Sequence, residues 1–567
     1  MVEQPKPTGR QQIASFITAR RTRVATSWRT GWQAVREQGL GQVQFWVLAL
    51  FIGLAAGTCA ILFRMGISLL QRTFYGADDY SLATAAAGLD WWVVMLMPIL
   101  GGLVVGLILT RFTTDQRVRS VAHVIEGAAM RDGRVEAKAG IASALASLIT
   151  LSTGGSTGRE GPVVHIAGLI STRISDLIHA DGMTARDLLG CAVAGAVAAS
   201  FNAPIAGALF ALEVILRHFA VHAFAPIVIS AVAGAVISRL TLGEVTEFVL
   251  APHTLAFYVE IPAFMLLGLV CGVVAVMMMK AVFFAEDAAS VVTQSLSIPP
   301  WARPAMAGAV LGVIALGFPH IIGVGYETTT RALTGQLLIW QAVIFAVVKV
   351  IAVAVTVGGR MGGGMFSPSL MVGALTGLAF GYIATNLFPT VSGTETLYAL
   401  AGMGAVAAAV LGAPISTALI VFELTGDWQT GLAVMVAVSL ACAVSTRLVD
   451  RSFFLTQLER RDVHVAAGPQ QYLLQTISVG RLMRPRGADN GASDSKCWEL
   501  IEQGAYLRTN ATLEQAMPLF NQSKLGIIPI VRIEGEEEPE LLGAVFEVDA
   551  LKSLNRALSA IAREEHS

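Results

Sequence analysis

The stretch "STGGSTGREGPVVHIAG" (152–168) sets an arginine and a glutamate side by side, among glycines and before a proline, in a chain that is mostly apolar. Proline has no backbone N–H and suits the first turn of a helix. "GREGP" (158–162) therefore predicts a loop that runs into a helix starting near Gly161–Pro162, and "GGGMFSP" (362–368) predicts a second such start. A helix start leaves backbone N–H groups unpaired and carries a partial positive charge.

The composition is that of a membrane protein. Of 567 residues, 54% are hydrophobic and 14% are charged, the mean hydropathy is +0.65, and soluble domains carry about 25% charged residues. A membrane span needs about 20 apolar residues, and these runs do not alternate as the strands of a membrane barrel do. The sequence predicts an all-α polytopic membrane protein. Eleven charge-free runs cover 43–63, 91–110, 139–158, 188–212, 218–238, 261–279, 305–326, 332–348, 361–394, 396–422 and 428–446.

Charge divides the chain into three parts. Residues 1–42 form a basic, amphipathic N-terminal segment, whose first 40 residues hold seven Lys/Arg and two acidic residues. Residues 43–460 form the membrane domain, and residues 461–567 return to a soluble composition. Basic residues flank both ends of the membrane domain, which predicts that both termini are cytoplasmic in a multi-pass protein of the cell inner (plasma) membrane. In the tail we expect a helix at 511–522, strands at 526–533 and 541–548, and a solvated turn at 534–540.

The membrane domain contains an internal repeat. A shift of 210 residues places "AASFNAPIAGALFALE" (198–213) over "AAVLGAPISTALIVFE" (408–423), with eight of sixteen positions identical. We therefore expect two inverted-repeat halves, roughly 43–240 and 260–460. Duplicated transporters place their binding sites near the bilayer midplane, where broken helices meet.

The glycine-rich helix starts indicate the sign of the ligand. Unpaired N–H groups are costly in a membrane interior but are tolerable where they bind an anion. A cation site would need paired carboxylates or carbonyl rings, and neither break has an acidic pair. An intramembrane enzyme would need a nucleophile with its base or a metal constellation, and neither pattern occurs, so we predict no enzyme and no metal site. The expected ligand is a small anion, and no nucleic acid.

Glu160 lies at this expected anion site. An ionised carboxylate there competes with the anion for the site, whereas a protonated carboxyl group leaves the site to the anion. Glu160 is therefore a candidate gate that is sensitive to protons. The alternative is a buried ion pair between Glu160 and Arg159. Intramembrane ionisable residues are functional candidates by default.

These motifs resemble those of the CLC family of chloride channels and proton/chloride antiporters, over most of 45–460. The likeness is carried by "GREGP", "GMFSP" (364–368), "FNAPIAGALFALE" (201–213) and "AGMGAVAAAVLGAPISTALIVFELTGD" (401–427). It implies a homodimer in the lipid bilayer, in which each subunit has its own pore for chloride and other small anions, and protons as a second partner. It also implies that Glu160 is the gating glutamate and that the amides of Met365 and Phe366 face a central anion, and that of Gly161 an external one. The supporting motif residues are Gly158, Arg159, Pro162, Gly364 and Pro368.

Three positions depart from the family pattern. Alignment on "IEGA" (125–128) puts "RSVAH" (119–123) at the family's serine motif, so Ser120 falls on the anion-binding serine while both glycines and the proline are lost. Phe454 stands where the family has an anion-coordinating tyrosine, and could wall the pore. Val214 stands where the antiporters commonly carry an inner proton-accepting glutamate. The repeat-related pair Glu213 and Glu423 is interpreted as structural.

The tail resembles a single CBS-type regulatory module. Asp549 matches a ribose-contacting aspartate, but the nearby hydroxyl residue is replaced by Phe546 or Glu547, so we expect no nucleotide cofactor and chloride as the bound ligand. Because Val214 removes the usual proton site, we predict passive chloride conduction with pH gating by Glu160. The alternative is a Cl⁻/H⁺ antiporter with a different proton path. Fluoride specificity is disfavoured by the retained "GREGP" and Ser120.

Overall fold

The computed structural model describes residues 41–219, 221–243, 248, 258–463, 465, 474, 477–488, 490–509, 511–523, 526–532 and 540–566. The basic segment 1–42 and the turn expected at 534–540 lie, but for their last residues, outside the described residues.

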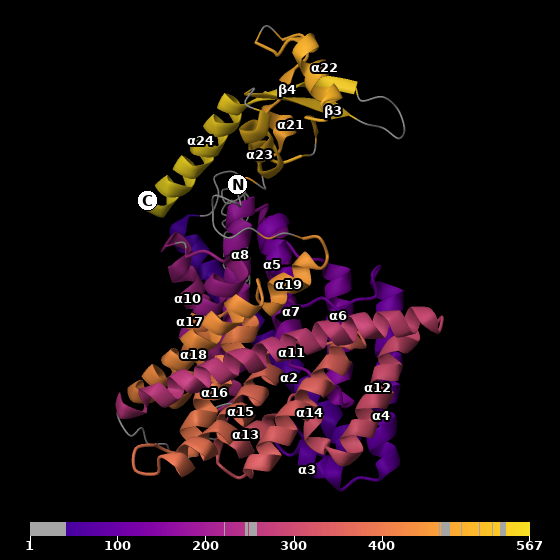
Figure 1. Cartoon of the computed structure of the whole chain (residues 1–567), viewed down its shortest axis with the longest axis vertical. Coiled ribbons are helices and arrows are strands. Elements are labelled where there is room, and N and C mark those ends of the chain that lie inside the picture. Colours follow the sequence, from indigo (N-terminus) through magenta and orange to yellow (C-terminus); the bar gives the residue numbers. More distant parts are fainter. Residues whose placement is uncertain are drawn as a thin grey trace, which may run out of the picture.

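The membrane part is helical, which confirms the predicted fold class (Figure 1). Nine of its helices, within the described ranges, are long and apolar enough to span a bilayer. Exposed apolar side chains cover the outside of this bundle, and many of its buried residues are Gly and Ala. Small residues of this kind let helices pack closely in lipid. The helical elements run, in chain order, α2 (Gln42–Tyr75), α3 (Leu82–Ala87), α4 (Trp91–Phe112), α5 (Val121–Met130), α6 (Ala137–Ser152), α7 (Glu160–Ile178), α8 (Gly182–Phe201), α9 (Pro204–Phe210), η1 (Ala211–Leu216), α10 (Val221–Leu242), η2 (Tyr258–Glu260), α11 (Ile261–Ser295), η3 (Pro300–Ala302), α12 (Arg303–Gly317), η4 (Pro319–Ile321), α13 (Tyr326–Leu333), α14 (Ile339–Gly358), α15 (Phe366–Leu387), α16 (Glu395–Leu411), α17 (Pro414–Thr425), α18 (Trp428–Leu448) and α19 (Phe453–Glu459).

The two copies of the repeat break their helices in the same way. α8 ends before Asn202 (φ 55°) and α16 before Gly412 (φ 69°), both left-handed residues. The next residue has nearly the same backbone in both copies, with φ −128° and ψ 83° at Ala203 and φ −129° and ψ 62° at Ala413, and Pro204 or Pro414 then opens α9 or α17. The likeness seen in the sequence is therefore a likeness of backbone.

Two carboxylates join the halves. Glu213, in the π-helical turn η1, accepts hydrogen bonds from the amides of Ile415 (2.9 Å) and Ser416 (2.8 Å) at the start of α17. Glu423, in α17, accepts them from the amides of Ile205 (3.0 Å) and Ala206 (2.8 Å) at the start of α9. Each glutamate thus satisfies the open N–H groups of the other half's helix. This reciprocity supports the structural interpretation of the pair.

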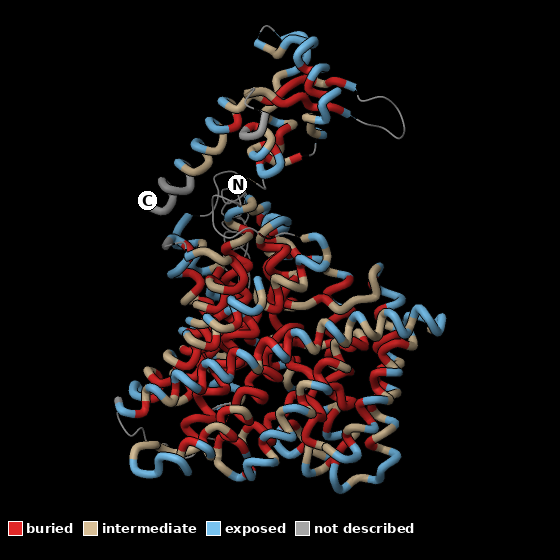
Figure 2. Tube along the Cα trace, in the orientation of Figure 1, coloured by how far each residue is buried: buried red, intermediate tan, exposed pale blue. Residues whose placement is uncertain are grey.

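The tail is a small α/β unit that lies at the same end of the molecule as α5, α8 and α19, which we call the tail side (Figure 1). Its sheet has the order β1-β4-β3-β2, with β4 antiparallel to β1 and β3, and β2 parallel to β3. Buried apolar residues of the strands and helices form its core, and Figure 2 marks buried positions of the tail in red. The expected helix and strands are present, with ends shifted by a few residues. The elements are α21 (Val479–Leu482), β1 (Arg484–Pro485), α22 (Asp494–Glu502), β2 (Leu507–Arg508), α23 (Leu513–Ser523), β3 (Ile527–Arg532), β4 (Glu540–Phe546) and α24 (Glu547–His566).

Candidate functional site

The two glycine-rich helix starts meet back to back. The Gly158 amide donates to the Gly364 carbonyl oxygen (2.8 Å), and the Gly364 amide donates to the Gly158 carbonyl oxygen (2.7 Å). The residues that precede the helices have nearly the same backbone, with φ −88° and ψ −16° at Arg159 and φ −94° and ψ −8° at Met365. α7 begins at Glu160, slightly earlier than expected, with Pro162 in its first turn. We call Gly158–Pro162 and Gly364–Pro368 together the helix-start region.

The glycines are required by this close approach. A Cβ atom on Gly364 would lie 2.9 Å from the Gly161 nitrogen, and one on Gly158 would lie 2.5 Å from the Glu160 carboxylate. A Cβ atom at position 364 would press on backbone that has to shift, while one at position 158 would mainly displace the flexible Glu160 carboxylate and would lie 3.1 Å from the Gly364 carbonyl oxygen. The glycines therefore serve the close pairing of the two backbones and leave room for the Glu160 side chain.

Glu160 is buried, with 3% of its surface exposed. Its carboxylate accepts hydrogen bonds from the hydroxyl group of Ser367 and, at 3.4 Å, from the Ser367 amide in the first turn of α15. A carboxylate at a helix N-terminus occupies a place suited to any small anion. The sequence analysis did not single out Ser367, although a hydroxyl residue inside the second glycine-rich motif was a usable signal. The Arg159 guanidinium lies over the Tyr326 ring, 4.9 Å from its centroid.

Met365 and Phe366, predicted to offer amides to the central anion, direct buried side chains into the core. The Phe366 ring lies 4.7 Å from the Phe201 ring and 6.0 Å from the Phe210 ring, centroid to centroid. Phe366 opens α15, where backbone amides have no acceptor in the preceding turn. The aromatic packing thus fixes the start of the helix whose amides are the candidate donors.

Ser120 precedes α5, as a helix-start serine would. Its hydroxyl group donates to the Gln457 side-chain oxygen of α19 at 3.0 Å, and its amide donates to Nδ1 of His123 at 3.1 Å. His123 stands where the family proline is lost, and its Nδ1 accepts the Ser120 amide, for which a proline side chain has no acceptor. The structure therefore ties Ser120 to the last membrane helix rather than directly to the helix-start region.

Val214 and Phe454, the two other departures, share the wall of one cavity of about 610 Å³. Ile125 of α5 adds to the apolar wall, and Arg217 and Arg451 bring positive charge to it. Phe454 offers this cavity no hydroxyl group and Val214 no carboxylate, but Glu213, Asp450, Thr446 and Ser452 also line it, so carboxylates and hydroxyl groups stand beside the two guanidinium groups.

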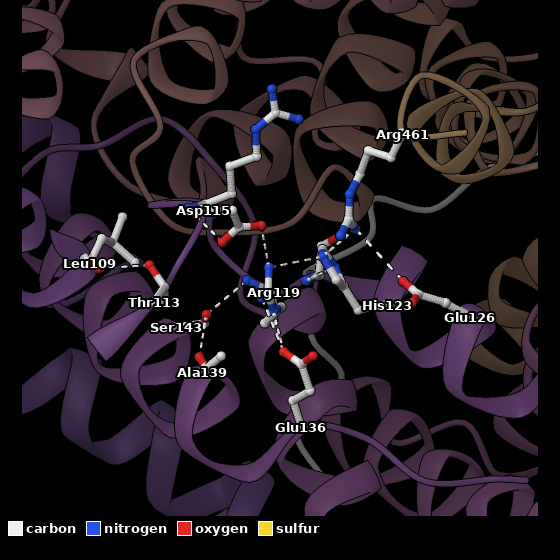
Figure 3. A network of polar contacts seen from close by, with 12 residues as sticks. Leu109, Thr113, Asp115, Arg119, His123, Glu126, Glu136, Ala139, Ser143 and Arg461 are labelled. Atoms are coloured by element: carbon white, nitrogen blue, oxygen red, sulfur yellow. Dashed lines mark hydrogen bonds and ion pairs between the residues drawn. The ribbon is translucent and has the colours of Figure 1, made fainter. Parts of the chain in front are cut away.

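A network of charged side chains surrounds the residues that replace the serine motif (Figure 3). Arg119, only 7% exposed, pairs with Asp115 (2.7 Å) and Glu136 (3.0 Å). Arg131 joins Glu136 (2.8 Å) to Glu126 (2.7 Å). Arg461, just beyond α19, contacts His123 and lies 3.8 Å from Glu126. We call these seven residues the charge network: Asp115, Arg119, His123, Glu126, Arg131, Glu136 and Arg461.

Two acids of this network lie in the loops that flank α5. The hydrogen bond from Arg131, with the charge of Arg119, holds the pKa of Glu136 below its ordinary value. Burial alone would raise the pKa of Asp115, but the hydrogen bond and charge of Arg119 outweigh it and lower that pKa. Both carboxylates are therefore ionised at neutral pH, and the network is held by charge. No sequence pattern indicated this network, because its members come from separate loops and helices that only the fold brings together.

A polytopic helical domain with duplicated broken helices and two glycine-rich helix starts in contact defines a membrane transport protein. The chain belongs to the voltage-gated chloride channel (CLC) family, which it matches over residues 101–446. It is 31% identical over 395 residues to a putative chloride channel protein ClcB-like of Ralstonia nicotianae, covering 69% of this chain and 91% of that protein.

Two solved structures share the fold. A slow cyanobacterial Cl⁻/H⁺ antiporter superposes with a TM-score of 0.65 at 20% identity, covering 74% of this chain and 98% of its own. A eukaryotic CLC transporter superposes with a TM-score of 0.64 at 18% identity, covering 89% of this chain and 98% of its own.

Proposed function

We propose that this protein transports chloride across a membrane through a pathway closed by the Glu160 carboxylate. One observation carries the proposal: Glu160, at the start of α7, reaches across to the first turn of α15 and accepts hydrogen bonds from Ser367 there. A carboxylate that fills an anion's place is a tethered competitor. The relative from Ralstonia, named a putative chloride channel, supports chloride as the ion.

In this proposal the proton state of Glu160 sets the gate. The ionised carboxylate holds the Ser367 amide and blocks the path. Protonation removes its negative charge, weakens those charge-assisted hydrogen bonds and frees the site for chloride. The amides of Gly161, Met365 and Phe366 would then bind the anion, with Ser120 joining when its hydroxyl group leaves Gln457.

Passive conduction is the mode we favour. Val214 and Phe454 line the cavity of about 610 Å³, and neither side chain can accept a proton or donate a hydrogen bond. Of the two carboxylates in the same wall, Glu213 and Asp450, the first accepts hydrogen bonds from the amides at the start of α17. Proton-coupled exchange is the second candidate, because a buried histidine, His165, lines a separate small cavity with two carboxylates. The cyanobacterial structure of the same fold is an antiporter.

We further propose a homodimer in the cell inner membrane, with both termini cytoplasmic and a CBS-like tail that uses no nucleotide. The Asp549 carboxylate, the residue that matches a ribose-contacting aspartate, is paired with Arg484 at 2.8 Å. That pairing supports a structural use of Asp549 within the tail.

Reversal potentials of reconstituted vesicles under crossed chloride and pH gradients test the function. We expect the potential to follow the chloride gradient and to ignore the proton gradient. A chloride gradient that drives protons uphill would replace passive conduction with exchange. Vesicles that carry cations, or no chloride, would overturn the proposal as a whole.

A further inference from the structure

Three arginines from separate segments gather around one carboxylate at the ends of membrane spans. Arg117 lies in the loop between α4 and α5, Arg303 opens α12, and Arg360 follows the end of α14. The Arg117 guanidinium pairs with the Glu286 carboxylate of α11 at 3.4 Å. We call Arg117, Glu286, Arg303 and Arg360 the arginine cluster. Its three guanidinium groups and one carboxylate give it an excess of positive charge.

Arg303 fastens these segments to one another. Its guanidinium donates to the carbonyl oxygen of Gly358, the last residue of α14, at 2.7 Å from one Nη and at 3.0 Å from Nε. It also donates to the Glu286 carbonyl oxygen and to the Ser290 hydroxyl group of α11, both at 3.0 Å. Arg303 is 5% exposed. Its hydrogen bonds are therefore used within the protein, while its charge still acts on the surroundings.

Arg360, two residues beyond Gly358, is a cation that this arrangement leaves without a partner. Its φ of 61° lies in the left-handed region, which costs free energy in residues other than glycine. In the part of the chain that the structure describes, its Nε is buried without a hydrogen-bond acceptor and its guanidinium forms no ion pair. Burial and then the charge of Arg117 lower the pKa of Arg360, and two nearby carboxylates offset this only in part. A strained backbone that presents an unsatisfied buried donor points to a ligand.

The arginine cluster is flanked by exposed apolar side chains. Trp301, 40% exposed, lies two residues before Arg303, and Phe284, 74% exposed, lies two residues before Glu286. Arg303 is also near the start of a candidate membrane span, Pro300–Gly317. Tryptophan is enriched at the level of the lipid headgroups. The cluster therefore lies where headgroups meet the protein, and the Arg117 side chain, 38% exposed, opens it to the outside.

We propose that the arginine cluster binds the phosphate group of an anionic phospholipid. Guanidinium groups bind phosphate oxygens through charge-assisted hydrogen bonds, and basic pockets between membrane helices hold anionic headgroups. Arg117 and Arg360 bind the phosphate oxygens, Arg303 adds its charge, and the acyl chains lie against the exposed apolar side chains of α11 and η3. The inference goes beyond the proposed function and does not depend on the chloride pathway.

The test is a lipid titration of the full chain in an uncharged detergent, read as the midpoint of thermal unfolding. Dioleoyl phosphatidylglycerol is the probe, and dioleoyl phosphatidylcholine, with the same chains and no net charge, is the reference. A ligand that binds only the folded protein raises the midpoint as its site fills. We expect half of the shift at an about 25-fold lower concentration of phosphatidylglycerol, which is about fivefold for each of two guanidinium groups.

Two substitutions should change the affinity in opposite directions. Arg360→Gly removes a guanidinium and suits the left-handed backbone, so this variant should fold like the parent and bind phosphatidylglycerol about fivefold more weakly. Glu286→Gln removes the competing negative charge and should bind it about fivefold more tightly. The matched control is Arg447→Gln, at an exposed arginine in the last turn of α18, which should bind the lipid like the parent.

Arg117→Gln repeats the test at the exposed side of the cluster and should also weaken binding about fivefold. Equal affinities in the parent, Arg360→Gly and Arg117→Gln would overturn the proposal, and so would an equal loss in Arg447→Gln, because any anionic surface would then attract the protein equally. A parent that responds alike to the two phospholipids would overturn it as well. Glycerol 3-phosphate, the headgroup chemistry without chains, should give no shift at the same concentrations. Protection by it equal to that of the lipid would replace the lipid with a soluble phosphate and overturn the assignment.

Discussion

The helix-start region and the charge network both provide hydrogen-bond acceptors for backbone amides at the start of a helix, but they use different groups to do so. In the helix-start region, glycines let two backbones pair, at 2.7 and 2.8 Å, and a single carboxylate caps one of the helices. At α5 the glycines are gone, and side chains do this work: His123 takes up the Ser120 amide, and Arg119 holds two acids. The first region relies on paired backbones and one carboxylate, and the second on several charged side chains.

The two regions also differ in how far they are exposed to water. The residues of the helix-start region are buried. The charge network reaches the surface at Glu136 and Arg131. Under the proposed function, a proton for Glu160 therefore has to come from outside a buried region, whereas the charge network is in direct contact with water.

The largest expected effect comes from removing the plug. Glu160→Gln keeps the size of the side chain but not its charge, so the competition with chloride ends. If the plug closes nine of ten molecules at pH 7, its loss raises the open fraction about tenfold, and chloride flux should rise accordingly and lose its pH dependence. Flux assays at pH 5 and pH 7 measure this. A variant whose flux keeps the parent's pH profile would show that Glu160 is not the gate.

A smaller effect is expected from filling the space between the two helix starts. Gly364→Ala adds a Cβ atom 2.9 Å from the Gly161 nitrogen, and overpacking of this kind costs about 1–3 kcal/mol of unfolding free energy. The loss should appear as a lower midpoint of thermal unfolding in detergent.

The matched control is Gly317→Ala at the end of α12, where a Cβ atom would have no neighbour within 4 Å. That variant should unfold like the parent. Equal midpoints for both variants would contradict the view that the helix-start region is closed to side chains.

The features of the fold and site that could be predicted from the sequence are those set by short local motifs. "GREGP", "GGGMFSP" and the repeat at 198–213 and 408–423 are short, and their glycines and prolines act on the backbone nearby, so the helix breaks could be predicted from the sequence, while the gating role of Glu160 stays a prediction. The contacts that complete the site are not local. Ser367 reaches Glu160 over 207 positions, and Arg461 reaches His123 over 338. No periodicity links such residues, because only the packed fold brings them together.

The capped helices α9 and α17 lie between the two extremes, since they combine a backbone break with a side-chain carboxylate. Glu423→Gln leaves one acceptor oxygen for the amides of Ile205 and Ala206 but removes the charge. A lost helix cap costs about 1 kcal/mol, and Glu213→Gln should cost a similar amount at α17. Chemical unfolding of the two variants measures the costs. A loss in one half alone would show that the π-helical turn at Glu213 changes the value of the cap.

The smallest effect concerns the acid stability of the charge network. Glu136 and Asp115 have folded-state pKa values below their ordinary values of 4.5 and 3.8. A lowered pKa means that the folded state binds the proton less readily than the unfolded state, so these groups stabilise the fold above their ordinary pKa values, and that contribution is lost as the pH falls through the lowered ones. Because the Glu136 side chain is 42% exposed, the contribution of its pairs is of the order of exposed ion pairs, about 0.2–1 kcal/mol.

Glu136→Gln should therefore unfold slightly more easily than the parent at pH 7, and the gap between the two unfolding free energies should narrow below about pH 4. Raising the salt concentration at pH 7 should narrow the same gap, since screening weakens exposed pairs. A gap that does not narrow at all as the pH falls below the ordinary value of 4.5 would mean that Glu136 stabilises the loop by packing rather than by charge, and the contrast with the helix-start region would then be one of geometry alone.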